Sequence, residues 1–254
     1  MVKINSILFN GCSVTYGEEL PEPENERFSK LICNDLGAEE INIAMCGSSN
    51  EAIFRTTVEY IASSKNITPD LVVIVWSGVD RFEAWHPTIK DPHSKVLYNV
   101  SPARIDKIYK KNKRVGQAYS MFYEYIMNVR TSIFKTLSMM YFLQEYLKSK
   151  KIPYLFYQFA EHTGSTIDIL YNDTHNRGES TDGMRELIIQ KYNQLEAQSI
   201  FGADIHSKDY TNTPRYWGDI NHDLAPHGHP LHKTQRFVSN LIISKLKELY
   251  DIRI

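Results

Sequence analysis

The sequence has few cysteines, almost no net charge and no long apolar run. Its three cysteines, Cys12, Cys33 and Cys46, are an odd number in a chain of 254 residues, and a chain of this length buries a core without disulfides. We therefore expect no disulfide framework and a reducing, cytoplasmic location. The 29 basic and 30 acidic residues nearly cancel, so no overall field attracts nucleic acid, and no nucleic-acid partner is expected.

Segments typical of secretion or membrane insertion are also missing. The longest apolar run, Leu71 to Trp76, is far shorter than the roughly 18 residues that cross a bilayer. The N-terminal segment has an apolar run only from Ile7 to Phe9, and no small-residue cleavage site follows it. We expect a soluble protein with no membrane partner and no signal peptide.

The common cofactor motifs are absent as well. No Gly-Lys-Ser/Thr follows the glycines near the N-terminus, as a phosphate-binding P-loop requires, and there is no G-x-G-x-x-G. Neither H-E-x-x-H nor C-x-x-C occurs, and both are typical of zinc sites. The sequence therefore predicts no cofactor.

Short apolar runs bounded by turn residues alternate with stretches of helical period, which is typical of βαβ units and a parallel sheet. The expected strands are Ser6 to Asn10, Glu40 to Ala44, Leu71 to Trp76, Ile152 to Phe159 and Ala203 to His206. The expected helices are Phe28 to Leu36, Asn50 to Ser64, Ala118 to Lys150 as one helix or two, Met184 to Ser199, and Pro230 to Tyr250. We expect one α/β domain over residues 1–254, with insertions at about 85–117 and 160–183.

The first insertion breaks the periodic pattern. Between Trp85 and Val115 prolines fall among charged residues, which predicts a long loop with short helical pieces. Within it, Ala103 to Arg114 is basic. A solvated loop is the first interpretation of that segment, and a phosphate-binding patch is the alternative.

Four polar, glycine-bearing segments are expected at the carboxyl edge of the sheet, where ligands of parallel sheets bind. They are GCSVTYG (11–17), MCGSSN (45–50), WSGVDR (76–81) and NHDLAPHGHP (221–230). In the first, Ser13 follows a strand and stands between glycines, so its hydroxyl projects from a tight turn beside N–H groups that stabilise an oxyanion. A plain strand-to-helix turn is the alternative.

A histidine cluster precedes the last helix. It consists of His222, His227, His229 and His232. A serine nucleophile needs a base within hydrogen-bond reach, and imidazole suits that role near neutral pH. Solvated surface residues, or a metal site completed by Asp219 or Asp223, are the other interpretations.

At these residues the sequence resembles the SGNH hydrolases, also called the GDSL family of serine esterases. GCSVTYG resembles the first block, G-D-S-x-T-x-G, with Cys12 in place of Asp, which implies that Ser13 is the nucleophile and an oxyanion donor. INIAMCGSSN resembles the second block, which implies that the backbone N–H of Gly47 is another donor. GHPLHKTQRFVSNLI resembles the last block, which implies that His229 is the general base.

Two positions depart from the family pattern. The third block is normally G-x-N-D with an oxyanion-donating Asn, and WSGVDR places Asp80 there, where a carboxylate repels a developing oxyanion unless it is protonated or turned away. The acid usually found three residues before the histidine is replaced by Pro226. Asp223 or Asp219 is then the candidate orienting acid for His229, and a backbone carbonyl in a Ser-His dyad is the alternative.

Two further residues are candidates for binding substrate. Arg81 follows Asp80. It either pairs with that carboxylate to order the loop, or its guanidinium binds an anionic group of the substrate with two parallel hydrogen bonds. Asn50 closes the second block and is the other candidate.

The resemblance implies a three-layer α/β/α sandwich with a flavodoxin-like, mainly parallel five-stranded sheet in the order 2-1-3-4-5. The residues of these blocks are similar to those of a divergent branch of the family, which is found in phage-encoded and bacterial proteins. The implied activity is hydrolysis of carboxylic esters, including acetyl groups on carbohydrates, so the expected partner is a small-molecule or glycan ester. The alternative function is a binding or structural protein that kept the fold while the site decayed.

Overall fold

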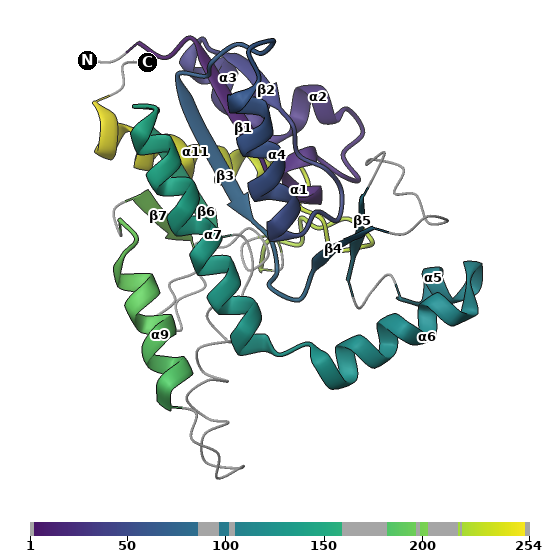
Figure 1. Cartoon of the computed structure of the whole chain (residues 1–254). Helices are drawn as coiled ribbons and strands as arrows, with labels where there is room; N and C mark the ends of the chain where they lie inside the picture. Colours follow the sequence, from purple (N-terminus) through teal and green to yellow (C-terminus); the bar gives the residue numbers. More distant parts are fainter. Residues whose placement is uncertain are drawn as a thin grey trace.

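The computed structural model describes residues 3–85, 97–101, 105–158, 182–196, 199–202, 218 and 220–251. The expected strand Ala203 to His206, nearly all of the expected insertion at 160–183, and Asp219 lie outside these residues. The elements in chain order are β1 (Ser6–Asn10), α1 (Ser13–Tyr16), α2 (Pro23–Glu26), α3 (Phe28–Leu36), β2 (Glu39–Asn42), α4 (Asn50–Ala62), β3 (Leu71–Trp76), β4 (Phe82–Trp85), β5 (Leu97–Val100), α5 (Ile105–Lys111), α6 (Lys113–Met121), the π-helix η2 (Phe122–Ile126), α7 (Val129–Ser149), β6 (Tyr154–Gln158), α9 (Asp182–Asn193), β7 (Ile200–Gly202) and α11 (His232–Tyr250) (Figure 1).

A parallel sheet forms the middle of the molecule. Its strand order is β2-β1-β3-β6-β7, and each neighbouring pair runs parallel. In register, Asn10 of β1 lies beside Ile74 of β3, and Trp76 lies beside Gln158 of β6. The expected α/β fold with a mainly parallel sheet and helices on both sides is confirmed.

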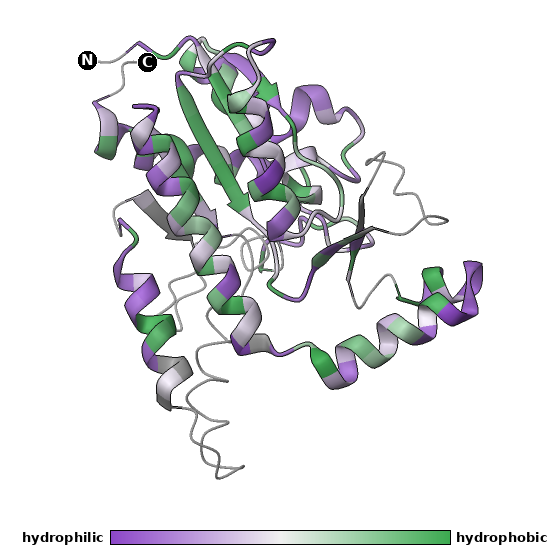
Figure 2. Ribbon diagram, viewed as in Figure 1, coloured by the Kyte–Doolittle hydropathy of each residue, from purple (hydrophilic) through white to green (hydrophobic). Residues whose placement is uncertain are grey.

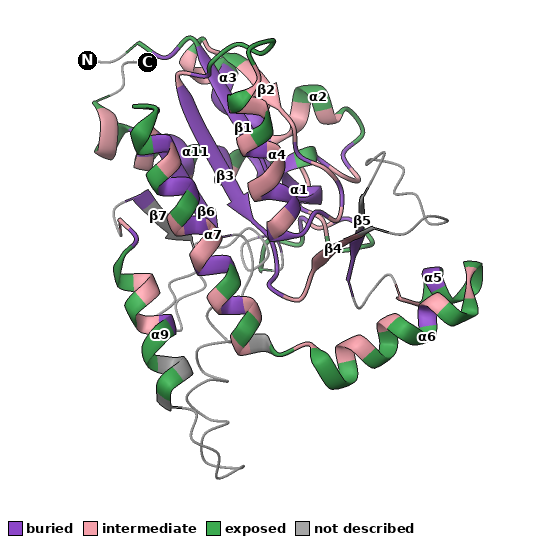
Figure 3. Ribbon diagram, in the orientation of Figure 1, coloured by how far each residue is buried: buried purple, intermediate pink, exposed green. Residues whose placement is uncertain are grey.

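Alternate residues of β3 enter two separate cores. Ile74 and Trp76 lie in the core shared with α4, α7 and α9, whereas Val73 and Val75 lie in the core shared with α3 and α11. Because helices cover both faces, the whole strand is buried, which explains its continuous apolar run. Figures 2 and 3 show the same strand as both hydrophobic and buried, while the outer sides of the helices are polar and exposed.

Local chemistry sets the ends of two long helices. The expected helix from Ala118 to Lys150 is divided because Asn128 is extended and its side chain accepts hydrogen bonds from two backbone N–H groups of α7, which caps that helix. The last helix begins at His232 rather than Pro230, since Pro230 pairs with Leu224 in an isolated bridge before the helix starts.

The segment expected to be a long loop with short helical pieces, Trp85 to Val115, takes part in a second sheet that begins just before it. Strands β4 and β5 pair antiparallel, with Phe82 opposite Val100, and α5 and α6 extend from them as an arm that projects away from the main sheet (Figure 1). Phe82 packs against Tyr119 and Phe122, with ring centroids 5.8 and 4.6 Å apart. The prediction missed these strands because they are short and their stabilising contacts come from residues about 20 to 40 positions away along the chain.

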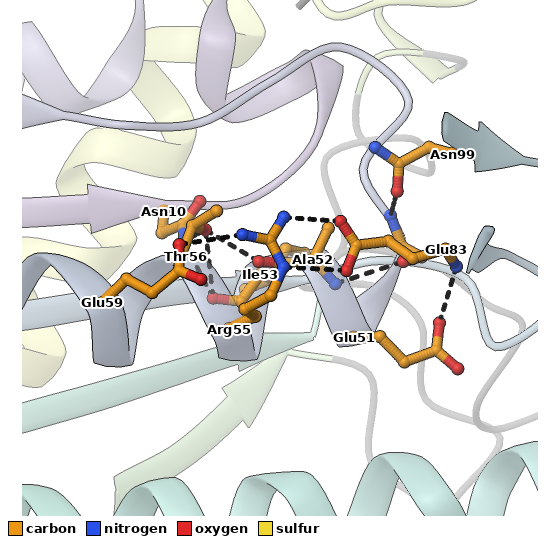
Figure 4. Close-up of polar contacts among 10 residues, drawn as sticks. Asn10, Glu51, Ala52, Ile53, Arg55, Thr56, Glu59, Glu83 and Asn99 are labelled. Atoms are coloured by element: carbon orange, nitrogen blue, oxygen red, sulfur yellow. Dashed lines mark hydrogen bonds and ion pairs between the residues drawn. The ribbon is translucent and has the colours of Figure 1, made fainter. Parts of the chain in front are cut away.

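Polar contacts join this hairpin to α4 (Figure 4). Glu83 of β4 accepts hydrogen bonds from Arg55 at 3.0 and 2.6 Å, and these bonds raise the pKa of the guanidinium. Asn99 of β5 accepts a bond from the backbone N–H of Ser49 at 3.0 Å. Since Ser49 caps α4, the hairpin and the second polar segment are held together.

None of the helices in the described part of the chain is long and apolar enough to cross a membrane.

No disulfide joins the three cysteines, and all three side chains are buried. Cys33 has no exposed surface, and burial raises the pKa of its thiol to about 12. The thiolate is the reactive form of cysteine. We therefore expect less than one thiol per native protein molecule to react with a chromogenic disulfide reagent within minutes, and all three thiols to react after denaturation. Rapid reaction of one thiol in the native protein would contradict the burial of these side chains.

Candidate active site

The polar segments that follow β1, β2 and β3, together with the segment before α11, meet at the carboxyl edge of the sheet. Ser13 is the first residue of α1, directly after β1, and its side chain is buried, with 7% of the residue exposed. Gly11 must be a glycine, because a Cβ there would lie 2.2 Å from Thr15 Oγ1 and 3.0 Å from the carbonyl oxygen of Val75. The chain at Ser13 therefore turns close against β3.

The turn after Ser13 brings two carboxylates to the last segment. Gly17 ends α1 in the left-handed region, with φ of 91°, and Glu19 also has a positive φ, 67°, which is uncommon for a residue with a side chain. Glu19 Oε2 lies 2.5 Å from Nδ1 of His229, and Glu18 Oε2 lies 3.4 Å from Nε2 of the same ring. The segment that carries Ser13 thus holds His229 between Glu18 and Glu19.

Glu19 is ionised in this arrangement. Partial burial tends to raise its pKa, but the hydrogen bonds from His229 and from the backbone of His227, together with the electrostatic interaction with both side chains, lower it below its ordinary value. An ionised carboxylate only accepts hydrogen bonds. Nδ1 of His229 must therefore carry the proton of the bond to Glu19, and the other ring nitrogen faces away from it.

The acid that orients His229 was missed by the sequence analysis. Asp223 has a different role: its carboxylate accepts a 2.6 Å bond from the backbone N–H of Thr234 and caps the first turn of α11. Asp223 is buried at the helix N-terminus, so it is engaged there rather than at the imidazole. The available signal was the acidic pair directly after the first block, Glu18 and Glu19, which the sequence does not connect to a histidine 210 residues away.

Backbone hydrogen bonds hold His229 in place. Its carbonyl oxygen accepts from the N–H of Ala225 at 2.8 Å, and the N–H of Gly228 donates to Ala225 at 2.8 Å. Glu19 Oε1 accepts from the N–H of His227 at 3.3 Å. Both oxygens of Glu19 therefore bind this turn, one at the backbone and one at the ring.

The expected oxyanion donors have N–H groups without acceptors. Neither the N–H of Ser13 nor that of Gly47 donates to any group in the described part of the chain. Gly47 has φ of 77°, a conformation that glycine adopts without strain. The described hydrogen bonds include none between Ser13 Oγ and the ring of His229.

Asn50 and Asp80 are positioned by contacts with neighbouring segments. The Asn50 amide donates to the carbonyl of Ser77 at 3.1 Å and accepts from its N–H at 2.8 Å, so it clamps the second segment to the third. The carbonyl oxygen of Asp80 accepts a 2.8 Å bond from the hydroxyl of Tyr123. The described residues show no ion pair between Asp80 and Arg81. Within the same part of the chain, Arg81 Nη1 is buried and has no hydrogen-bond partner.

The histidines were also candidates for metal binding. The described residues contain no group of three His, Cys, Asp or Glu side chains placed to hold a metal ion. Asp219, one of the acids considered for such a group, is outside those residues.

The sequence matches a family model over residues 22–185, more than half of the chain. The chain belongs to this family, DUF6071, which is described as a family of unknown function. The matched region of this DUF6071 protein includes Gly47, Asp80 and Arg81, and Ser13 and His229 lie outside it. A search of curated proteins found no match.

Solved hydrolase structures are similar to the DUF6071 protein in fold. TesA has a TM-score of 0.50 at 13% identity, covering 96% of this chain and 99% of its own. The psychrotrophic esterase EstA from Pseudoalteromonas sp., in a structure inhibited by monoethylphosphonate, has a TM-score of 0.50 at 11% identity, covering 97% and 99%. The lipase Lip_vut3 from a goat rumen metagenome has a TM-score of 0.50 at 15% identity, covering 95% and 97%. At identities this low, the structural similarity shows an esterase-like fold and nothing finer.

Proposed function

We propose that this DUF6071 protein hydrolyses carboxylic esters through an acyl-enzyme formed on Ser13. The observation that carries the proposal is the contact between Glu19 and Nδ1 of His229. It supplies the imidazole with a carboxylate although Pro226 occupies the usual position of the acid. A carboxylate on one ring nitrogen fixes the tautomer in which the other nitrogen accepts a proton.

In the proposed mechanism, Nε2 of His229 takes the proton from Ser13 Oγ as the oxygen attacks the ester carbonyl. The ring becomes an imidazolium, and Glu18 and Glu19 on its two sides stabilise that charge. The alcohol then leaves with the proton from His229. Water, activated by the same ring, releases the acid from Ser13.

The oxyanion of the tetrahedral intermediate is assigned to the backbone N–H groups of Ser13 and Gly47. Both are without acceptors in the described part of the chain, which is the state that an oxyanion hole requires before substrate binds. Asp80 takes the position of a third donor. Because an ionised carboxylate cannot donate, we propose that the hole has two donors and that the Asp80 side chain turns away from the oxyanion.

The test of this function is labelling with a fluorophosphonate, which reacts with activated serines, followed by intact-mass measurement. The wild-type protein is expected to gain a single adduct, and Ser13→Ala and His229→Ala to gain none. Ser48→Ala is the matched control, because Ser48 is another buried serine of the same edge, and it should keep the adduct. Absence of an adduct on folded wild-type protein would reject the hydrolase and favour a binding protein with the same fold.

A further inference from the structure

A cavity of about 210 Å³ lies beside the third polar segment, between the first turns of α4 and α7. Its wall includes Asn50 and Glu51 of α4, Arg81 and Phe82, and Lys135 of α7. Ligand pockets for drug-sized molecules have volumes of about 300 Å³ or more, so this cavity suits a smaller group. It opens at the same edge of the sheet as the segment that carries Ser13.

The unusual feature of the cavity is the guanidinium of Arg81. Its Nη1 atom is buried and has no hydrogen-bond partner among the residues that the structure describes. A buried charged donor without an acceptor destabilises the protein, because the water it lost is not replaced. A ligand that brings an acceptor to this atom would remove that cost.

Several of the other polar groups around the cavity have partners among the described residues. The Asn50 amide is bonded to the backbone of Ser77, and Asn128 accepts from the first turn of α7. Glu51 accepts from the backbone N–H of Glu83 at 3.2 Å, as Figure 4 shows. The buried donor without a described partner therefore belongs to a cation, which favours an anion as ligand.

The charges around the cavity also favour an anion. Arg81 and Lys135 bring two positive charges against the single carboxyl of Glu51. Burial raises the pKa of Glu51 above its ordinary value, although the backbone N–H of Glu83 and the charge of Lys135 oppose that shift. The N-termini of α4 and α7, with the positive ends of their dipoles, border the same space.

We propose that this cavity binds a carboxylate on a compact apolar body, with Arg81 as its charged partner. The planar guanidinium matches a carboxylate with two parallel hydrogen bonds, and Val79, Phe122 and Met139 supply apolar walls. The inference rests on the proposed function in one point: we assign the bound carboxylate to the ester substrate, as a group on either its acyl or its alcohol part. The site itself does not depend on catalysis.

Benzoate is a suitable probe, and benzamide is its uncharged counterpart of the same shape. Isothermal titration is expected to show saturable benzoate binding to the wild-type protein and to Ser13→Ala, with affinity at least about tenfold lower in Arg81→Met and several-fold lower in Arg81→Lys. Benzamide should bind at least about tenfold more weakly than benzoate. Arg236→Met is the matched control, because Arg236 pairs with Asp35 on the opposite face of the sheet, and it should bind benzoate normally.

Three results would overturn the inference. They are no benzoate binding to the wild-type protein, equal affinity for benzoate and benzamide, and an unchanged affinity in Arg81→Met. The melting temperature of Arg81→Met gives an independent check. It should not fall, because the substitution removes the buried Nη1 donor that has no described partner and keeps the apolar stem. Benzoate binding without fluorophosphonate labelling would reject the hydrolase while leaving this site established.

Discussion

Replacing Ser13 by alanine is expected to lower ester hydrolysis by at least about 10³-fold, because no other group can form the acyl-enzyme. His229→Ala should lower the rate of hydrolysis to a similar extent. The serine and its base act together, so the rate losses from the two substitutions are not additive. The measurement is kcat/KM on a panel of p-nitrophenyl esters of increasing acyl length, starting with acetate. The double variant should lose little more than either single variant.

The controls for this prediction concern folding. Ser13 begins the short helix α1, His229 lies in the segment before α11, and neither belongs to the hydrophobic cores. The far-ultraviolet circular dichroism and melting temperature of both variants should therefore stay close to those of the wild-type protein. Wild-type activity in either variant would remove these residues from the mechanism. A measurable rate in the wild-type protein that both variants retain would indicate a contaminating esterase.

Replacing Glu19 by glutamine is expected to lower kcat by about 10²- to 10⁴-fold with little change in KM. The amide of glutamine can donate a hydrogen bond to Nδ1 of His229, which would place the imidazole proton on Nε2 and block acceptance from Ser13. The variant also loses the negative charge that stabilises the imidazolium. Glu19 would thus act as a positioning residue through His229.

Two matched substitutions separate this role from a general loss of structure. Glu19→Asp should restore part of the rate, because a carboxylate is present on a shorter stem. Glu18→Gln is the matched control: Glu18 is the neighbouring, more exposed carboxylate and lies near the other ring nitrogen, so we expect less than about a tenfold effect there. Equal losses from Glu19→Gln and Glu18→Gln, or no recovery of rate in Glu19→Asp relative to Glu19→Gln, would contradict the assignment.

Much of the fold follows from local patterns. The strands Ser6–Asn10 and Leu71–Trp76 have the bounds expected from their apolar runs. Buried parallel strands are recognisable because each residue faces a helix layer, so almost no polar residue interrupts them. Boundaries that depend on a single cap or bridge, such as the break at Asn128, were less visible.

The segment after β3 shows where local patterns stop. Strands β4 and β5 are short and separated in sequence, and they are stabilised by Phe82 packing on α6 and η2 and by the Glu83–Arg55 pair with α4. None of these contacts leaves a periodic signal in the sequence. The last strand illustrates the same limit: β7 occupies Ile200–Gly202, whereas the sequence predicted Ala203 to His206, which lies outside the described residues.

The sequence by itself determined the α/β class, the main strands and the segments that meet at the carboxyl edge, because strand burial and turn chemistry are local. It also named Ser13, Gly47 and His229 as candidates through their short motifs. Only the tertiary structure decided that Glu19 contacts His229, that Asp223 caps a helix, and that Arg81 Nη1 is buried without a partner in the described part of the chain. These contacts depend on how distant segments of the chain pack. The residues next to a carboxylate or guanidinium in the sequence do not indicate which group it will contact in the folded protein.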